Sequence, residues 1–245
     1  MIDDQVQAVG EKGMGTNYVA CALRVEARHL RDVLLGNRVL RWMIEGGLER
    51  PEIGEAREAY ARLLRMSADY VRFTIPALRA ASAVLLVSTS VNDHAWAARL
   101  ADYALDETQE AGEGHESWAF ADLADLGEGC DGALHPAAVE YGWYFVDRAD
   151  AHPYAILGAK SVLEELSVRV ANVILSRARD LGVVPTSGEE ASRFMHHHGD
   201  LDVEHARQGA RDLRCLSSSE QRRQVLEGAY ITTGIYRQLA QHYLL

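Results

Sequence analysis

Apolar residues recur at intervals of three and four positions along nearly the whole chain, and no segment alternates strictly between apolar and polar residues. This period is typical of helices packed on one face and gives no sign of β-strands. The first helical stretch covers residues 17–45 and is ended by Gly46 and Gly47. The whole pattern predicts about seven helices in one all-α bundle, a single domain over residues 17–245 behind a polar lead at residues 1–16.

Capping residues predict where the later helices begin. A long helix is expected over residues 153–182, between a proline that can start it and a glycine that can end it. Ser187 with Glu190 has the spacing of a capping box, which should open the following helix. Ser217 with Glu220 repeats this spacing before the last helix.

Composition narrows the class of protein. The 245 residues carry a net charge of −11, and such an acidic surface repels nucleic acid. No apolar run is long enough to span a membrane, and the polar N-terminus is unlike a signal peptide. The three cysteines are an odd number without motif spacing, so a cytoplasmic protein with reduced thiols is expected; they are Cys21, Cys130 and Cys215. The composition does not decide between a monomer and a homodimer.

The segment 193–209, RFMHHHGDLDVEHARQG, carries many side chains that can bind a metal. Extending the apolar stripe from Phe194 by steps of three and four reaches His198, Asp202 and His205, so these three should face the bundle interior. A single inward histidine is usually a hydrogen-bonded core residue, but burying three ionisable groups together is costly without compensation. Imidazole and carboxylate ligands suit zinc, iron or manganese. The residues expected on other faces are His196, Asp200 and Glu204.

A second carboxylate is expected to face inward from the helix over 153–182. Glu164 is the only charge on the stripe Leu157, Ser161, Glu164, Val168, Ala171 and Leu175. Glu165 lies about 100° further round, where Arg169 can pair with it in solvent. A buried carboxylate without a counter-charge is costly, so Glu164→Gln is expected to stabilise the metal-free protein.

The remaining ligands are expected from residues 96–118. Glu107 and Glu110 continue the apolar stripe of that segment, and His115 and Trp118 resume it beyond two glycines, although acids at helix ends are often simply exposed. The combined set resembles in number the ligands of a dinuclear, carboxylate-bridged iron site. It comprises Glu107 or Glu110, His115, Glu164, His198, Asp202 and His205.

Three motifs together resemble the haem-oxygenase-like diiron oxidases and oxygenases, relatives of the TenA-type thiaminases and the pyrroloquinoline quinone synthase. They are EAGEGHESWAFADLADLG (110–127), YAILGAKSVLEELS (154–167) and HGDLDVEH (198–205), and the match covers residues 90–245. Close relatives carry the first glutamate about one turn before the histidine, where this chain has Ala111 and Gly112. Glu110 is therefore the ligand if the glycines mark a bulge or insertion, with Glu107 as the alternate and Glu113 least favoured. The other ligands implied by the resemblance are His115, Glu164, His198, Asp202 and His205.

By resemblance, the fold is a seven-helix, haem-oxygenase-like bundle that binds two Fe(II) ions, the second often labile, and uses O2 as co-substrate. The implied activity is oxidation of a small, amino-acid-derived metabolite by N-oxygenation or by C–C or C–N cleavage, in natural-product biosynthesis, with a reductase or small-molecule reductant. Pocket walls would come from Trp118, Tyr141 and Tyr144, although core packing also explains these aromatic residues. Two alternatives remain: a TenA-like hydrolase, which needs a cysteine nucleophile, and a non-catalytic helical metal-binding protein.

Overall fold

The computed structural model describes residues 16–111, 115–129, 133–188 and 190–245; of Thr16, residues 109–111 and Leu201 it describes the backbone alone. Every regular element in these residues is helical, so the predicted all-α fold is confirmed. The expected polar lead lies outside the described residues, except for Thr16, which begins the first helix. None of the described helices combines the length and the apolar character that crossing a bilayer requires.

The described residues form ten α-helices rather than the expected seven. One reason is that the first predicted stretch divides at Asn37, whose side chain accepts hydrogen bonds from the backbone N–H groups of Val39 and Leu40 and so starts a new helix. The helices are α2 (Thr16–Leu34), α3 (Arg38–Glu45), α4 (Ile53–Val71), α5 (Thr74–Leu86), α6 (Val91–Ala111), α7 (His115–Asp125), α8 (Pro136–Gly142), α9 (Ala155–Asp180), α10 (Arg193–Asp212) and α11 (Ser219–Tyr243). A π-helical turn (Trp143–Asp147) follows α8, and a 3₁₀ turn (Leu213–Cys215) follows α10.

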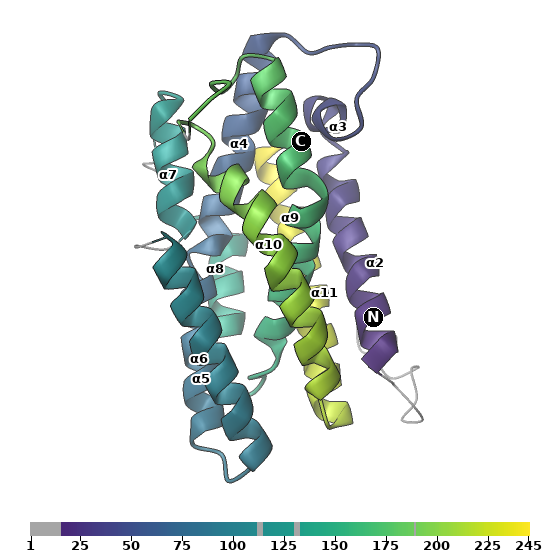
Figure 1. Cartoon of the computed structure of the whole chain (residues 1–245), viewed down its shortest axis with the longest axis vertical. Coiled ribbons are helices and arrows are strands. Elements are labelled where there is room, and N and C mark those ends of the chain that lie inside the picture. Colours follow the sequence, from purple (N-terminus) through teal and green to yellow (C-terminus); the bar gives the residue numbers. More distant parts are fainter. Residues whose placement is uncertain (1–15, 112–114, 130–132, 189) are drawn as a thin grey trace.

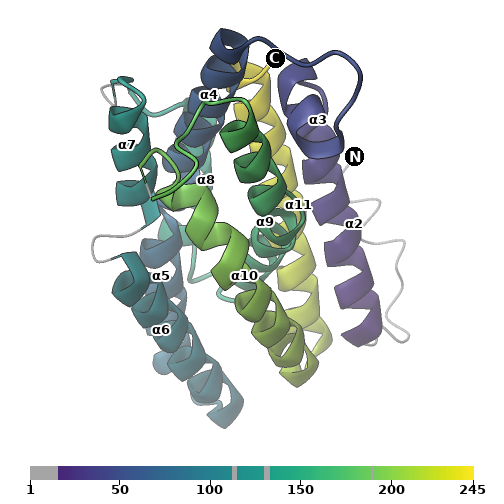
Figure 2. The same ribbon diagram turned by 45° about the horizontal axis from the view of Figure 1, so that its top comes forward.

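Helix α9 runs through the bundle and packs against α10, α11 and α2 (Figure 1). Helices α5 and α6 form an antiparallel pair at one side, and α7 continues along that side beside α4. Figure 2 shows α10 crossing α9 obliquely. Helix α10 also packs against α7, and α7 packs against the end of α6, so these four helices surround one region of the interior.

Glycines allow α9 to approach two neighbouring helices closely. A Cβ atom on Gly158 of α9 would lie 1.8 Å from the carbonyl oxygen of Val225, and one on Gly228 of α11 would lie 1.9 Å from that of Ala155. At the crossing with α10, a Cβ atom on Gly199 would lie 2.1 Å from the side chain of Asn172. These contacts fix the depth at which α9 sits between α10 and α11.

Neither expected capping box starts its helix at the predicted position. Helix α10 begins at Arg193 and not near Ser187, and the carboxylate of Asp122 on α7 accepts its first free N–H groups, from Arg193 (3.0 Å) and Phe194 (2.8 Å). The box before α11 is shifted by one residue from the expected Ser217 and is formed by Ser218 with Gln221. The start of α10 therefore depends on a residue that is remote in the sequence.

Candidate metal centre

Helix α10 presents three of the expected ligands to the bundle interior. Asp202 is buried, and the side chains of His198 and His205 are 14% and 16% exposed. The spacing of four and three residues keeps all three on one face, which confirms the predicted inward stripe. The Nδ1 atom of His198 lies 3.0 Å from Asp202 Oδ2, and that of His205 lies 3.7 Å from Asp202 Oδ1.

Helix α9 contributes a glutamate and a lysine to the same region. Glu164 is buried, as predicted, and its Oε1 lies 3.9 Å from His205 Nδ1. The ammonium group of Lys160, one turn earlier on α9, is also buried and makes a short hydrogen bond to Glu164. The predicted surface pair of Glu165 with Arg169 is present on the outer side of the helix.

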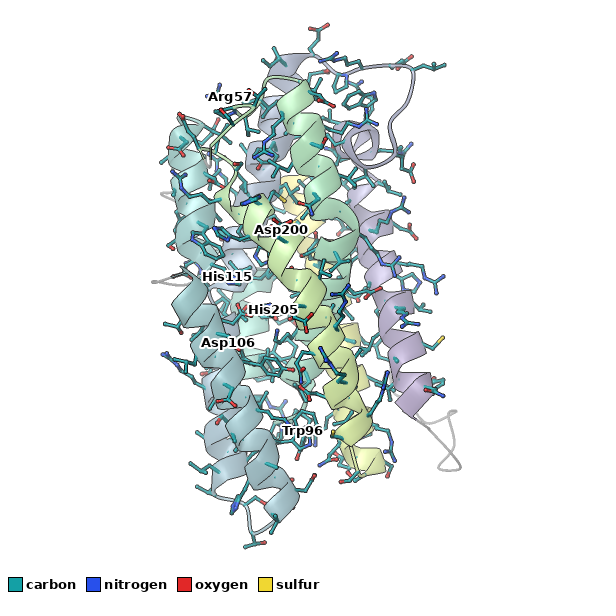
Figure 3. The ribbon with its side chains drawn as sticks, viewed as in Figure 1. Arg57, Trp96, Asp106, His115, Asp200 and His205 are labelled. Carbon is teal, nitrogen blue, oxygen red and sulfur yellow. The ribbon has the colours of Figure 1, made fainter. Side chains whose placement is uncertain are left out.

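Helices α6 and α7 complete the cluster from the other side. Glu107 near the end of α6 is 5% exposed, and its Oε2 lies 3.1 Å from the Nδ1 atom of His115, the first residue of α7. Its Oε1 lies 3.7 Å from Lys160 Nζ. The rings of His115 and His198 meet edge to face at 4.8 Å. Figure 3 shows His115 and His205 on the helices that border this interior space.

Among the side chains that the structure describes, Glu107 is the glutamate placed against His115. Glu110 lies on the last turn of α6, but its side chain is outside the described part of the chain, as is Glu113. Among the described residues, Glu107, Glu164 and His205 each offer a ligand atom within 4.8 Å of the others. The alternate in the sequence interpretation is thus the glutamate that the described geometry brings to the cluster.

Burial and neighbouring charges act in opposite directions on these groups. Burial lowers the pKa of His115 to about 4, although the carboxylate of Glu107 opposes this shift. Burial also acts to lower the pKa of Lys160, but Glu164 and Glu107 outweigh it and hold that pKa above its usual value. For Glu164, burial raises the pKa against the effect of Lys160. The cluster therefore contains carboxylates whose charge needs a nearby cation.

The donor set fits a bound divalent ion. The Nε2 atom of His198 is buried and has no hydrogen-bond partner among the described residues, while Asp202 holds the other ring nitrogen. Histidine ligands commonly show this arrangement, because a carboxylate on one nitrogen orients the other toward the metal. Imidazole nitrogen and carboxylate oxygen together suit iron, manganese or zinc.

Comparison with known proteins decides the family. The family model described as iron-containing redox enzyme matches residues 65–236. The chain belongs to this family of iron-containing redox enzymes. A crystal structure from Shewanella denitrificans OS217, of a domain of unknown function with a haem-oxygenase-like fold, superposes with a TM-score of 0.65 at 15% identity, covering 89% of this chain and 90% of that one. At this identity the likeness to the solved structure supports the fold alone. The search of curated proteins found no match to the chain.

Among the cavities lined by described residues of this iron-containing redox enzyme, two reach both Glu107 and His115. The inner cavity, of about 70 Å³, is lined by carboxylates and imidazoles of the cluster and by aromatic residues that include Tyr70 and Tyr141. The outer cavity, of about 240 Å³, reaches Glu107 and His115 from the α5 side. Its wall also carries Arg72, Arg79 and Glu116. The candidate ligands thus lie between an interior space whose remaining walls are mainly apolar and aromatic and an outer space with two guanidinium groups.

The three aromatic residues expected at the pocket occupy different places. Tyr141 is buried and lines the inner cavity. Trp118 stacks on the ring of His115 at 4.8 Å and on that of His197 at 4.1 Å, so it supports the ring of a candidate ligand. Tyr144 stacks on His152 at 5.5 Å, and neither of these two described cavities includes it in its lining.

Sequence reasoning missed Lys160 and misplaced Val168. Val168 was expected on the inward stripe of α9 but is 39% exposed. The inward face is therefore rotated toward Leu157, Lys160 and Glu164, which are all buried. The signal was present, because Lys160 stands three residues after Leu157 and four before Glu164. Only its charge argued against an inward position.

Proposed function

We propose that the protein is a non-haem iron oxidase or oxygenase that uses O2, with two cation positions at the centre, and acts on a small, amino-acid-derived metabolite. The observation that carries this proposal is the convergence of six side chains from four helices on one buried region. They are Glu107, His115, Glu164, His198, Asp202 and His205.

The residues have separable tasks in this proposal. His198, with its buried Nε2, and the carboxylate of Asp202 bind on the α10 side, and Glu107 and Glu164 bind across from them. Iron bound there supplies the electrons with which O2 is reduced. Tyr141 and the other apolar walls of the inner cavity keep water away from the reacting groups.

The outer cavity supports a substrate class. Its volume of about 240 Å³ is below the roughly 300–1,000 Å³ of pockets that hold drug-sized ligands, so it suits a small metabolite. Arg72 and Arg79 on its wall can bind a carboxylate, and Glu116 can accept hydrogen bonds from an amine. A small amino acid or a close derivative has both groups. Glu107 and His115, two of the proposed iron ligands, line this cavity, so a metabolite bound in it lies beside the iron.

The proposal is tested by loading the metal-free protein with Fe(II) without oxygen and then mixing it with O2. We expect a transient visible absorption, and O2 consumption that rises with small amino-carboxylates. His198→Ala should lower the iron bound per chain, whereas His196→Ala, a matched change on the outer face of α10, should not. Full iron binding without O2 consumption would contradict the oxygenase and favour a non-catalytic metal-binding protein.

The hydrolase alternative lacks a supporting contact in the described residues. Cys21 and Cys215 are both exposed, and neither lines the inner or the outer cavity. Cys130 lies outside the described residues. A cysteine nucleophile needs a nearby base and access to the substrate, so the oxidase or oxygenase remains the function that the cluster supports best.

A further inference from the structure

Lysine is nearly absent from this chain, and the described part contains a single one. Arginine supplies 23 of the 25 basic residues, and the two lysines are Lys12 and Lys160. Lys160 is 8% exposed, although lysine is almost never buried without a partner. An ammonium group is a compact point charge, whereas the guanidinium of arginine is a broad planar fork. A buried lysine in an arginine-rich protein therefore indicates that a compact cation is needed at this place.

The ammonium group lies beside two of the three residues that could hold a divalent ion. It contacts Glu164 directly and lies 3.7 Å from Glu107, and these two glutamates with His205 form the candidate cation site. The ring of Tyr103 closes the opposite side, with its centroid 4.5 Å from Lys160 Nζ. The lysine thus has carboxylate and aromatic neighbours, as a buried cation requires.

We propose that the Lys160 ammonium group occupies one of the two cation positions, so that the protein at rest holds one tight divalent ion and a second ion competes with this lysine. The inference rests on the proposed metal centre and names the residue that controls its occupancy. The cation position that Lys160 occupies is the one formed by Glu107, Glu164 and His205. The tight ion then takes the position beside His115, His198 and Asp202.

The charges of the described residues account for this order of binding. Glu107, Glu164 and Asp202 contribute −3, and Lys160 reduces the total to −2. One divalent ion makes the cluster neutral, whereas a second would leave +2 in a buried space while the lysine stays in place. Uncompensated buried charge is strongly unfavourable. The repulsion between the ammonium group and a bound ion is large because both contact the same carboxylates and so lie close together. The second ion can bind tightly only when the ammonium group leaves the glutamates.

The test measures metal binding and needs no turnover. Metal-free protein is titrated with Mn(II) without oxygen, and free and bound Mn(II) are followed by electron paramagnetic resonance. We expect the wild type to bind one ion tightly and a second about 100-fold more weakly, as repulsion from the ammonium predicts. Lys160→Met, which keeps the length of the side chain without its charge, should bind two ions with similar affinity and show a spin-coupled signal.

Two further variants make the result interpretable. Arg169→Met removes one positive charge from the exposed face of the same helix, so it should bind Mn(II) as the wild type does. The folding of Lys160→Met is compared with that of the wild type by circular dichroism. If the methionine variant does not fold, Lys160→Gln takes its place. The proposal is overturned if the wild type binds two ions equally tightly, or if a folded Lys160 variant keeps the wild-type pattern.

The outcomes also separate this inference from the proposed function. Binding as expected without O2 consumption by the Fe(II) protein would remove the oxidase function and leave the role of Lys160 intact. Consumption of O2 by a wild type that binds two ions equally tightly would overturn the role of Lys160 and leave the oxidase function intact.

Discussion

The buried ion pair of α9 leads to a prediction that opposes the one drawn from the sequence. Without a counter-charge, Glu164→Gln was expected to stabilise the metal-free protein. The structure supplies the counter-charge, because the ammonium of Lys160 binds Glu164 directly and both side chains are buried. Removing the carboxylate should therefore destabilise the metal-free protein.

The magnitude follows from what each partner keeps. Breaking a buried ion pair by removing one member costs about 3–5 kcal/mol. Here the amide oxygen of glutamine still accepts a hydrogen bond, and Glu107 remains 3.7 Å from the ammonium of Lys160, so we expect about 2–3 kcal/mol. In a chain of 245 residues this lowers the Tm by about 4–12 °C. Glu165→Gln on the adjacent position breaks a partly exposed pair with Arg169 and should cost at most about 0.5 kcal/mol.

Both variants are unfolded with urea in the presence of a chelator, and the loss of helix is followed by circular dichroism. A double-mutant cycle with Lys160→Met isolates the pair: the double variant should be less destabilised than the sum of the single ones. The reasoning is refuted if Glu164→Gln leaves the free energy of unfolding unchanged or raises it. It is equally refuted if Glu165→Gln is the more damaging of the two.

Three further predictions concern the packing, the capping and the cysteines. Gly228→Ala should destabilise the protein strongly or prevent folding, because the added Cβ atom would overlap the backbone of α9. The control is Gly234→Ala on the same helix, whose Cβ atom meets nothing within 4 Å. This control should be neutral, or should raise the free energy of unfolding in urea by up to about 1 kcal/mol. Asp122→Ala should cost about 1–2 kcal/mol by the same measurement, because two N–H groups at the start of α10 lose their acceptor; a change below about 0.5 kcal/mol would contradict this capping role. A variant without cysteines should keep its O2 consumption, and loss of activity in a folded, iron-loaded variant would revive the hydrolase; the replaced residues are Cys21, Cys130 and Cys215.

Helical periodicity was sufficient to predict the class of fold and the inward direction of the candidate ligands on α9 and α10. An α-helix repeats every 3.6 residues, so the apolar residues around Phe194 fix the direction of His198, Asp202 and His205 whatever they contact. The same argument separated Glu164 from Glu165. These are properties of one helix and its pattern, and they need no knowledge of its neighbours.

Contacts between helices decided what the pattern could not. The start of α10 moved to Arg193 because Asp122, on α7, supplies the acceptor for its first N–H groups. Residues 187–190 have a suitable local spacing, but a local hydrogen bond is worth little when the packed chain offers a better-placed carboxylate.

The direction of Lys160 was likewise set by the tertiary structure. Its long aliphatic stem can lie along either a polar or an apolar surface, so periodicity alone leaves the position of its charge undecided. Glu107, on a different helix, places a second carboxylate within 3.7 Å of the ammonium group and makes an interior position favourable. The sequence thus determined which residues could face the centre, and only the position of Glu107 opposite α9 in the folded chain decided that a lysine does.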